Sequence, residues 1–258
     1  MNVNDILEFV SELAPFSLAE SWDNCGLLIG GLHSEVKTVM PVLDVTVDVL
    51  KEARNKNVDL IISHHPVIFD GMKNIDANSV QYFAVKNDIA VISAHTNLDM
   101  ANGGVTDTLC KALGIENTKV LCPTAEIDGV TYGIGAVGNI KQPMTPDELA
   151  KFVKLTLGCD GVKLVRGNKE IKTVAVANGS ESGMLSYAAA AGADALVAGE
   201  TKHNVMVDAK NLGITLIDAG HFETENVIVG VLEQKLKQRF PELMVIHSGS
   251  NICPYEII

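Results

Sequence analysis

Segments with the hydrophobic period of a helix alternate along the chain with short, continuously apolar segments of strand length. Ile6, Val10 and Leu13 recur at helical spacing and predict an amphipathic helix over residues 4–14. Further helices are predicted over 46–56, 78–86 and 104–113, and strands over 36–45, 59–63 and 89–93. This alternation is typical of a parallel or mixed sheet that is covered by helices on both faces.

The pattern changes after residue 120. Asp128-Gly129 lies between two apolar runs and predicts a hairpin over 120–138. Thr145 and Glu148 form a capping box at the start of a helix that reaches about residue 157. Strands are then predicted over 162–166, 171–177, 193–198, 214–219 and 243–247, and helices over 184–191, 203–211 and 225–239. We therefore predict an α/β protein with one half formed by 1–125 plus 226–258 and the other by 126–225.

Composition and charge limit the classes of protein to which the chain can belong. The 258 residues are 47% hydrophobic, which is enough for one large or two smaller cores, and the formal net charge is −12. A general surface for nucleic acid is not supported by this charge, although a bound cation could change it locally. Five cysteines without a CxxC pair indicate reduced thiols. With no signal-peptide pattern and no apolar run of about 18 residues, we expect a cytoplasmic protein without a membrane segment.

Four predicted strands end in side chains that can bind a metal ion. Such groups gather at strand ends in helix-covered sheets, so we expect them to converge. Histidine, aspartate and glutamate without cysteine suit Zn, Mn, Fe, Co or Ni better than Mg. The other two histidines, His33 and His247, are expected to be solvated or to have packing roles. The strand-end residues are His64 and His65, His95 and Asp99, Glu200 and His203, and His221, Glu223 and Glu225.

Each of these residues also has a structural interpretation. His64-His65 alone could be a hydrogen-bonded polar strand end, and Asp99 alone could cap a helix. His221 and Glu225 share a face if the helix has begun, but they could form an exposed polar pair. Glu223 points elsewhere on that helix and is expected to be solvated. The convergence of four strand ends, rather than any one pair, favours a metal site.

The adjacent histidines favour two metal ions. Neighbouring side chains on an extended backbone point to opposite sides, and Pro66 biases His65 toward extended geometry. One ion would bind both His64 and His65 only across a sharp turn. Two cations about 3.5–4 Å apart, sharing a carboxylate, explain the pair better.

The motifs in this order also resemble a known family. SWDNCGLLIGG, LDVT, DLIISHHPVIF, SAHTNLD, DALVAGETKH and GHFETE are similar to the motifs of the Nif-three-like family, whose members are often named GTP cyclohydrolase I type two homologues. The resemblance covers nearly the whole chain. It implies two interlocked similar halves, each a mixed β-sheet covered by helices, and a toroidal homohexamer. Longer members carry an insert between the halves, for which this chain has no room.

The resemblance also implies residue roles. It implies a dinuclear centre with Glu225 as the shared carboxylate, and we expect His95 to act as the catalytic acid or base. Cys25 could be an extra soft ligand or a small filler beside Gly26. Asp23, Asp44 and Glu200 are expected to orient ligands or to contact substrate. The metal ligands that the resemblance implies are His64, His65, Asp99, His221 and Glu225.

The expected function is hydrolysis of a small nucleotide-type substrate with two divalent cations, as in a GTP cyclohydrolase. One alternative is a phosphoesterase acting on nucleotides or single-stranded nucleic acid. Another is a metal-storage or regulatory scaffold without turnover. The segment NGSESG (178–183) could hold a phosphate ahead of a helix, but it lacks the Gly-Lys-Ser/Thr of a P-loop and is better explained as a tight turn.

Overall fold

The computed structural model describes residues 1–180 and 183–258, which form two compact units. Unit 1 comprises Met1–Asn102 and Ile228–Ile252, and unit 2 comprises Gly103–Val227 and Cys253–Ile258. Residues 103–125, which the sequence analysis assigned to the first half, contribute a helix and a strand to unit 2. The last six residues also lie with unit 2, so the chain contributes two segments to each unit.

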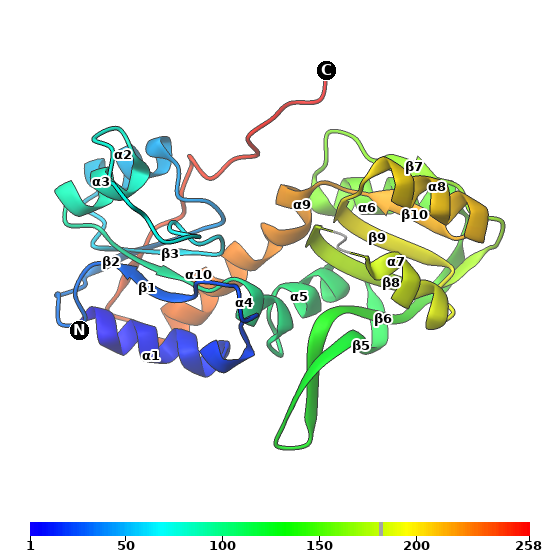
Figure 1. Ribbon diagram of the computed structural model, residues 1–258, viewed down its shortest axis with the longest axis horizontal. Coiled ribbons are helices and arrows are strands. Elements are labelled where there is room, and N and C mark those ends of the chain that lie inside the picture. The colour runs from blue at the N-terminus through cyan, green and yellow to red at the C-terminus, as the bar shows by residue number, and fades with distance from the viewer. Residues whose placement is uncertain (181–182) are drawn as a thin grey trace. The chain divides into compact units, whose positions relative to one another are not determined.

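Unit 1 is built on a five-stranded sheet in the order β1-β4-β3-β2-β11 (Figure 1). Strand β1 is antiparallel to its neighbour, whereas the other four strands are parallel to one another. The strands are β1 (Gly26–Ile29), β2 (Thr38–Val42), β3 (Leu60–Ser63), β4 (Ala90–Ser93) and β11 (Met244–Val245). The helices are α1 (Val3–Leu13), η1 (Phe16–Leu18), α2 (Val47–Asn55), α3 (Val80–Lys86), α4 (Thr96–Met100) and α10 (Val227–Arg239), the last belonging to unit 1 from Ile228.

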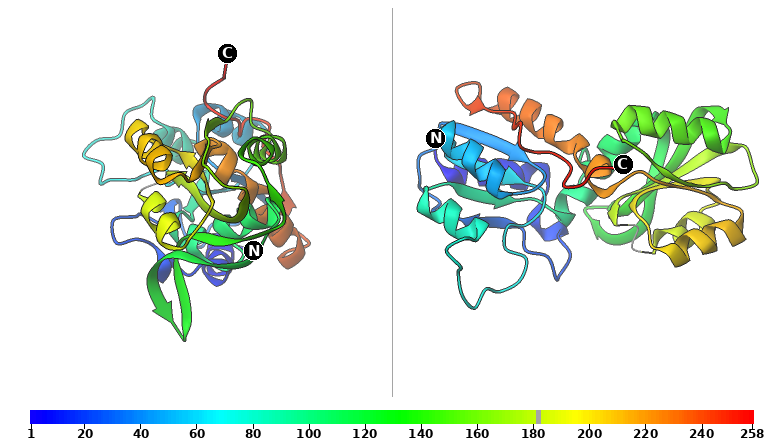
Figure 2. Two further views of the ribbon diagram at one scale, coloured as in Figure 1. Left: turned by 90° about the vertical axis from the view of Figure 1, so that its right-hand side faces the viewer. Right: turned by 90° about the horizontal axis from the view of Figure 1, so that it is seen from above.

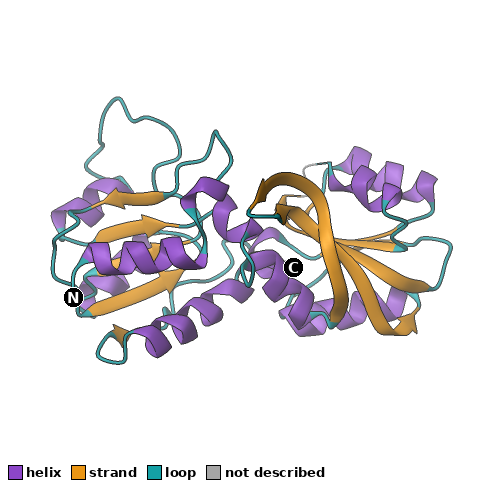
Figure 3. Ribbon diagram, turned by 90° about the horizontal axis from the view of Figure 1, so that it is seen from below, coloured by secondary structure: helices purple, strands orange, loops and turns teal. Residues whose placement is uncertain are grey.

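Helices cover both faces of this sheet. Leu50 of α2 and Ala84 of α3 pack with Ile61 of β3 in one core, and α1 and α10 lie on the opposite side of the sheet (Figures 1 and 3). Burial from both sides explains why β3 and β4 are apolar runs without alternation. These two strands are parallel and in register, with Ser63 opposite Ser93. The residues that follow them therefore emerge side by side at one edge of the sheet.

Unit 2 is built on a six-stranded mixed sheet in the order β5-β6-β8-β9-β10-β7. Strands β8, β9 and β10 are parallel, and the remaining pairings are antiparallel. The strands are β5 (Ile115–Ile127), β6 (Val130–Met144), β7 (Lys163–Val165), β8 (Ile171–Ser180), β9 (Ala195–Glu200) and β10 (Thr215–Asp218). The helices are α5 (Val105–Ala112), α6 (Pro146–Leu157), α7 (Met184–Ala190), α8 (His203–Leu212) and α9 (His221–Glu225).

Alternating side chains divide unit 2 into two cores. Val174 and Val176 of β8 face α5 and α6, whereas Ala175 and Ala177 face α7 and α8. The predicted turn at Asp128-Gly129 connects β5 and β6, and both residues have the positive φ that such a turn requires. The strands are longer than predicted, and the hairpin extends beyond the rest of its sheet (Figures 1 and 2).

The predicted fold class is confirmed. Both sheets are mixed and covered by helices, and no insert domain separates the units within the described residues. The structure differs from the predicted elements around the strand ends. The short helix α4 was not predicted, and the single helix expected over 225–239 is two helices, α9 and α10. Across the described residues, no helix combines the length and apolarity needed to cross a bilayer.

Candidate metal site

Three imidazoles cluster at the edge of the unit 1 sheet. The ring centroids of His64, His65 and His95 are separated by 5.0, 5.3 and 5.5 Å. One ring nitrogen of each lies within 4.8 Å of those of the other two. His64 is fully buried, while the other two are partly accessible. The predicted convergence of the ends of β3 and β4 is therefore observed.

The adjacent histidines do not point to opposite sides. Their amides still donate to the carbonyls of Val42 and Leu43 on the neighbouring strand, at 3.1 and 3.0 Å. However, β3 ends at Ser63, and the backbone bends at His64 and at His65. This bend brings the rings together, so the prediction from extended geometry is wrong. The position of this pair alone no longer requires two ions.

An acceptor holds the Nδ1 atom of every imidazole in this cluster. Carbonyl oxygens and ionised carboxylates only accept hydrogen bonds, so each Nδ1 carries the proton. Each Nε2 then keeps a lone pair, which is the arrangement that metal-binding histidines need. The Nδ1 atoms donate to Ala94 O at 2.9 Å from His64, to Asp44 Oδ1 at 2.8 Å from His65, and to Asp23 Oδ1 at 2.9 Å from His95.

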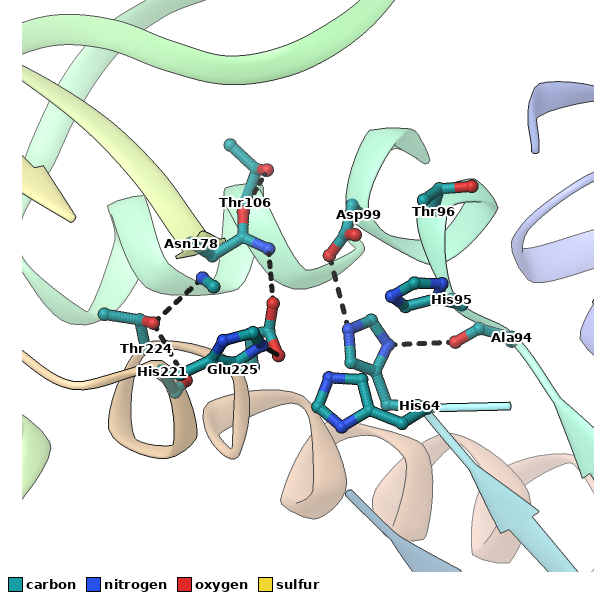
Figure 4. Close-up of polar contacts among 12 residues, drawn as sticks. His64, Ala94, His95, Thr96, Asp99, Thr106, Asn178, His221, Thr224 and Glu225 are labelled. Carbon is teal, nitrogen blue, oxygen red and sulfur yellow. Dashed lines mark hydrogen bonds and ion pairs between the residues drawn. The ribbon is translucent and has the colours of Figure 1, made fainter. Parts of the chain in front are cut away.

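Asp99 adds a carboxylate to this cluster. Its Oδ1 lies 3.5 Å from His64 Nε2, as drawn in Figure 4. Asp99 is the fourth residue of α4, whose N-cap position is His95. It therefore does not occupy the N-cap, and the interpretation of Asp99 as a helix cap is not supported.

Asp23 is a buried carboxylate that organises the loop beside His95. It accepts hydrogen bonds from His95 Nδ1, from Thr96 N at 3.0 Å and from Cys25 Sγ at 3.1 Å. Burial alone would raise the pKa of this carboxyl, but these hydrogen bonds and the neighbouring imidazole hold the pKa well below its ordinary value. Burial and the adjacent carboxylate raise the pKa of the Cys25 thiol to about 12. Cys25 is therefore a neutral thiol that donates to Asp23, as expected of a small packing residue.

In unit 2, His221 and Glu225 form a second pair of metal-binding side chains. They are the first and last residues of α9, and His221 Nε2 lies 3.0 Å from Glu225 Oε2. Glu225 is only 3% exposed. Its other oxygen accepts from Asn178 Nδ2 at 3.4 Å (Figure 4). Glu200 Oε2 lies 3.3 Å from His221 Nδ1. His221 thus repeats the pattern seen in unit 1, with an acceptor on Nδ1.

Two glycines that the sequence analysis did not single out allow α9 to pack closely on the sheet. A Cβ on Gly179 of β8 would overlap Glu225 Oε1 and lie 3.1 Å from His221 Nε2. A Cβ on Gly199 of β9 would overlap the Gly179 carbonyl and the Thr224 hydroxyl. That hydroxyl accepts from Gly179 N at 3.1 Å. The glycines therefore form a cradle that places the Glu225 carboxylate.

Comparison with known proteins gives the family. Residues 1–254 match the family model described as Duf34/NIF3 (NGG1p interacting factor 3). The chain belongs to the Duf34/NIF3 family. The resemblance seen in the sequence motifs is thus confirmed.

Curated relatives of this Duf34/NIF3 protein cover its whole length. A protein of Clostridium perfringens named "GTP cyclohydrolase 1 type 2 homolog" is 32% identical over 264 residues, covering 100% of both chains. A protein of Clostridium acetobutylicum with the same name is 33% identical and covers 99% of this chain and 98% of its own.

Solved structures show the same fold. A Bacillus cereus protein related to NIF3 superposes with a TM-score of 0.91 at 25% identity, covering 100% of this chain and 99% of its own. A Staphylococcus aureus protein superposes with a TM-score of 0.90 at 30% identity and the same coverage.

Some predicted residues of this family member lie apart from the two clusters. Glu223 is only partly accessible, and its Oε2 atom is buried beside Gly220. His203 is exposed at the start of α8, and His33 is exposed as expected. His247 Nδ1 lies 2.7 Å from Glu233 Oε1, which accepts its hydrogen bond. In NGSESG, Asn178–Ser180 complete β8, and 181–182 lie outside the described residues.

The side chains present suit a borderline divalent cation. Unit 1 brings together His64, His65, His95 and Asp99, and unit 2 brings together His221 and Glu225. Imidazole nitrogens with fixed tautomers and carboxylate oxygens are ligands for Zn, Fe, Mn, Co and Ni. The cradle formed by Gly179 and Gly199 also suits a bound cation. It holds the buried Glu225 carboxylate against the His221 imidazole, and the contacts described for Glu225 include no lysine or arginine. The Duf34/NIF3 protein thus carries groups that can bind metal ions.

Proposed function

We propose that this protein binds two divalent cations per chain and hydrolyses a nucleotide-type substrate with them. The proposed ligands are His64, His65, Asp99, His221 and Glu225. The observation that carries the proposal is the shared orientation of the imidazoles. Each has an acceptor on Nδ1, and Nε2 of His64 and His221 lies toward the carboxylates of Asp99 and Glu225, respectively. Metal-binding histidines almost always have such a partner on the ring nitrogen that does not face the ion.

The number of ligands supports two cations rather than one. Five side chains, two of them carboxylates with two oxygens each, exceed what one four-coordinate ion binds. Glu225 suits a shared position because its two oxygens lie against different partners, His221 and Asn178. Zn, Fe, Mn, Co and Ni all accept these ligand types. When bound, such cations lower the pKa of a coordinated water and polarise the bond to be hydrolysed.

His95 is proposed to move the proton. Its Nδ1–H is held by Asp23, so Nε2 is the atom that accepts a proton from water and donates it to the leaving group. The depressed pKa of Asp23 keeps this carboxylate ionised, and its charge stabilises the imidazolium that forms. Asp23 is a positioning residue in this scheme.

The names of the relatives support the substrate class. Proteins at 32% and 33% identity carry the name "GTP cyclohydrolase 1 type 2 homolog", so GTP is the first substrate to test. The chain has a formal net charge of −12, which disfavours a phosphate unless cations supply local positive charge. We also propose the toroidal homohexamer that the family resemblance implies, to be tested by sedimentation.

Turnover by metal-reconstituted protein tests the function. Purified protein is stripped with a chelator, reloaded with Zn²⁺, Mn²⁺ or Fe²⁺, and assayed with GTP, a generic phosphodiester and a generic phosphomonoester. Release of formate from GTP identifies ring opening, whereas release of an alcohol from either ester identifies a phosphoesterase. We expect activity that needs metal and is lost in Asp99→Ala and Glu225→Ala.

The control is His203→Ala, because His203 is an exposed histidine at the start of α8. This variant should keep full activity. Activity that survives both Asp99→Ala and Glu225→Ala would come from a contaminant. Stoichiometric metal without turnover on all three substrates would favour a storage or regulatory scaffold and would refute the hydrolase.

A further inference from the structure

Two large aromatic rings lie exposed beside the imidazole cluster of unit 1. Trp22 is 57% exposed and Phe69 is 49% exposed. Their ring centroids are 5.7 Å apart and the ring planes differ by only 30°. Aromatic rings stabilise a fold mainly when they are buried, so this pair contributes less to folding than buried rings of the same size would. Neighbouring exposed apolar side chains are typical of a binding surface.

Partly buried hydrogen bonds hold the two segments that carry these rings. Asp23, next to Trp22, is fixed by His95 and Thr96. Asn24 donates from Nδ2 to the carbonyl of Ile68, next to Phe69, at 2.6 Å. The loop that carries Trp22 is thus tied both to the imidazole cluster and to the loop that carries Phe69. The ring pair is a preorganised surface rather than two independent side chains.

The surface borders His95 directly. The ring centroids of Trp22 and Phe69 each lie 6.1 Å from that of His95, with interplanar angles of 75° and 68°. The plane of the imidazole is therefore steeply inclined to both aromatic rings. A flat ring lying on Trp22 or Phe69 would place its own edge near His95 and the neighbouring histidines.

We propose that Trp22 and Phe69 form a stacking surface for the heteroaromatic ring of the substrate, a purine base in the first instance. This inference rests on the proposed function, and it names the part of the substrate that this surface recognises. Stacking on an aromatic side chain contributes about 1–3 kcal/mol per base and does not depend on charge. It therefore suits a chain whose formal net charge of −12 repels phosphate.

Guanosine, which has the base but no phosphate, tests the surface separately from metal binding and turnover. Its affinity is measured by equilibrium dialysis with protein kept in chelator. Trp22 is the only tryptophan, so its fluorescence reports contact with the ring directly. The same titration with free N-acetyltryptophanamide measures the loss of fluorescence that is due only to light absorbed by guanosine, and this loss is subtracted.

We expect guanosine to quench Trp22 and to bind roughly 5- to 100-fold more weakly to Trp22→Ala and Phe69→Ala. Trp22→Phe should retain most of the affinity, because it keeps an aromatic face. The matched control is Tyr82→Ala, which removes a 39% exposed aromatic ring from α3 and should change nothing. Circular dichroism checks that each variant is folded.

Two results would overturn the proposal. One is guanosine affinity that is the same in wild type, Trp22→Ala and Phe69→Ala. The other is dissociation of an assembly in the same two variants, seen by sedimentation, because the rings would then be covered by a second copy of the chain. Guanosine binding that depends on Trp22 in a protein without GTP turnover supports the stacking surface and refutes only the hydrolase.

Discussion

Replacement of Gly179 by alanine perturbs the candidate site without replacing any proposed ligand. Gly179 has φ +59, and its position against α9 leaves no space for a methyl group. The added Cβ would overlap Glu225 Oε1 and lie 2.9 Å from Glu225 Cδ. Real Cβ contacts are essentially never shorter than 3.0 Å, so the Glu225 carboxylate must move.

The expected effect has two parts. A left-handed backbone costs alanine about 1–2 kcal/mol relative to its ordinary conformation, which lowers the free energy of unfolding. Displacement of Glu225 also weakens its interaction with His221, whose Nε2 would lie 3.1 Å from the new methyl group. Loss of a group that positions a ligand typically costs 10- to 100-fold in metal affinity. We expect a loss of at least this size, because the ligand itself moves.

Gly158→Ala is the matched control. Gly158 has φ +72 at the C-cap of α6, and a Cβ there meets no atom within 4 Å. It carries the same kind of backbone cost without the clash. Calorimetric titration with Zn²⁺ or Mn²⁺ should therefore show wild-type affinity for Gly158→Ala and weak binding for Gly179→Ala, although both are destabilised in thermal unfolding. Equal metal affinity in the two variants would refute the claim that Gly179 positions Glu225 for metal binding.

Three further predictions concern unit 1. Asp23→Asn should lower kcat about 10- to 100-fold with unchanged metal content, because His95 loses its ionised partner; unchanged kcat would contradict this role. Cys25→Ser should retain full metal stoichiometry by elemental analysis, because the thiol donates to Asp23 and a serine hydroxyl can do the same; loss of metal would show that it is a ligand. Glu52 accepts from Lys56 Nζ at 2.6 Å and from Ser248 Oγ at 2.8 Å, and despite burial such bonds lower its pKa below the ordinary 4.5. This stabilisation is present above pH 4.5 and is lost as the pH falls, so Glu52→Gln should cost about 1–3 kcal/mol in urea unfolding at pH 7 and progressively less in acid; a constant difference would exclude this linkage.

Local sequence signals were sufficient for most of the fold. The capping box of Thr145 and Glu148 is formed in the structure, and Asp128-Gly129 turns the β5–β6 hairpin. Apolar runs such as 59–63 identify buried strands because helices cover both faces of the sheet. The order of the strands could not be derived in this way, because it depends on contacts between distant segments.

The geometry of the candidate site could be predicted from the sequence only in part. Extended geometry predicted that His64 and His65 diverge, but the bend after β3 brings their rings together. Such a bend depends on the environment at the sheet edge, which no local pattern encodes. The sequence pattern predicted a tight turn for the segment that contains Gly179, whereas the role of this glycine is to leave room for Glu225. The glycine itself was visible in the sequence, but its partner lies 46 positions further along the chain.

An anomalous-difference map from a crystal of metal-loaded protein, collected at the absorption edge of that metal, tests the central claim most directly. The account predicts two peaks per chain, with His64 Nε2 and Glu225 oxygens within about 2.0–2.2 Å of a peak, as for zinc ligands. Strong peaks elsewhere on the chain, or none beside His64 and Glu225 in protein that carries metal by elemental analysis, would contradict it.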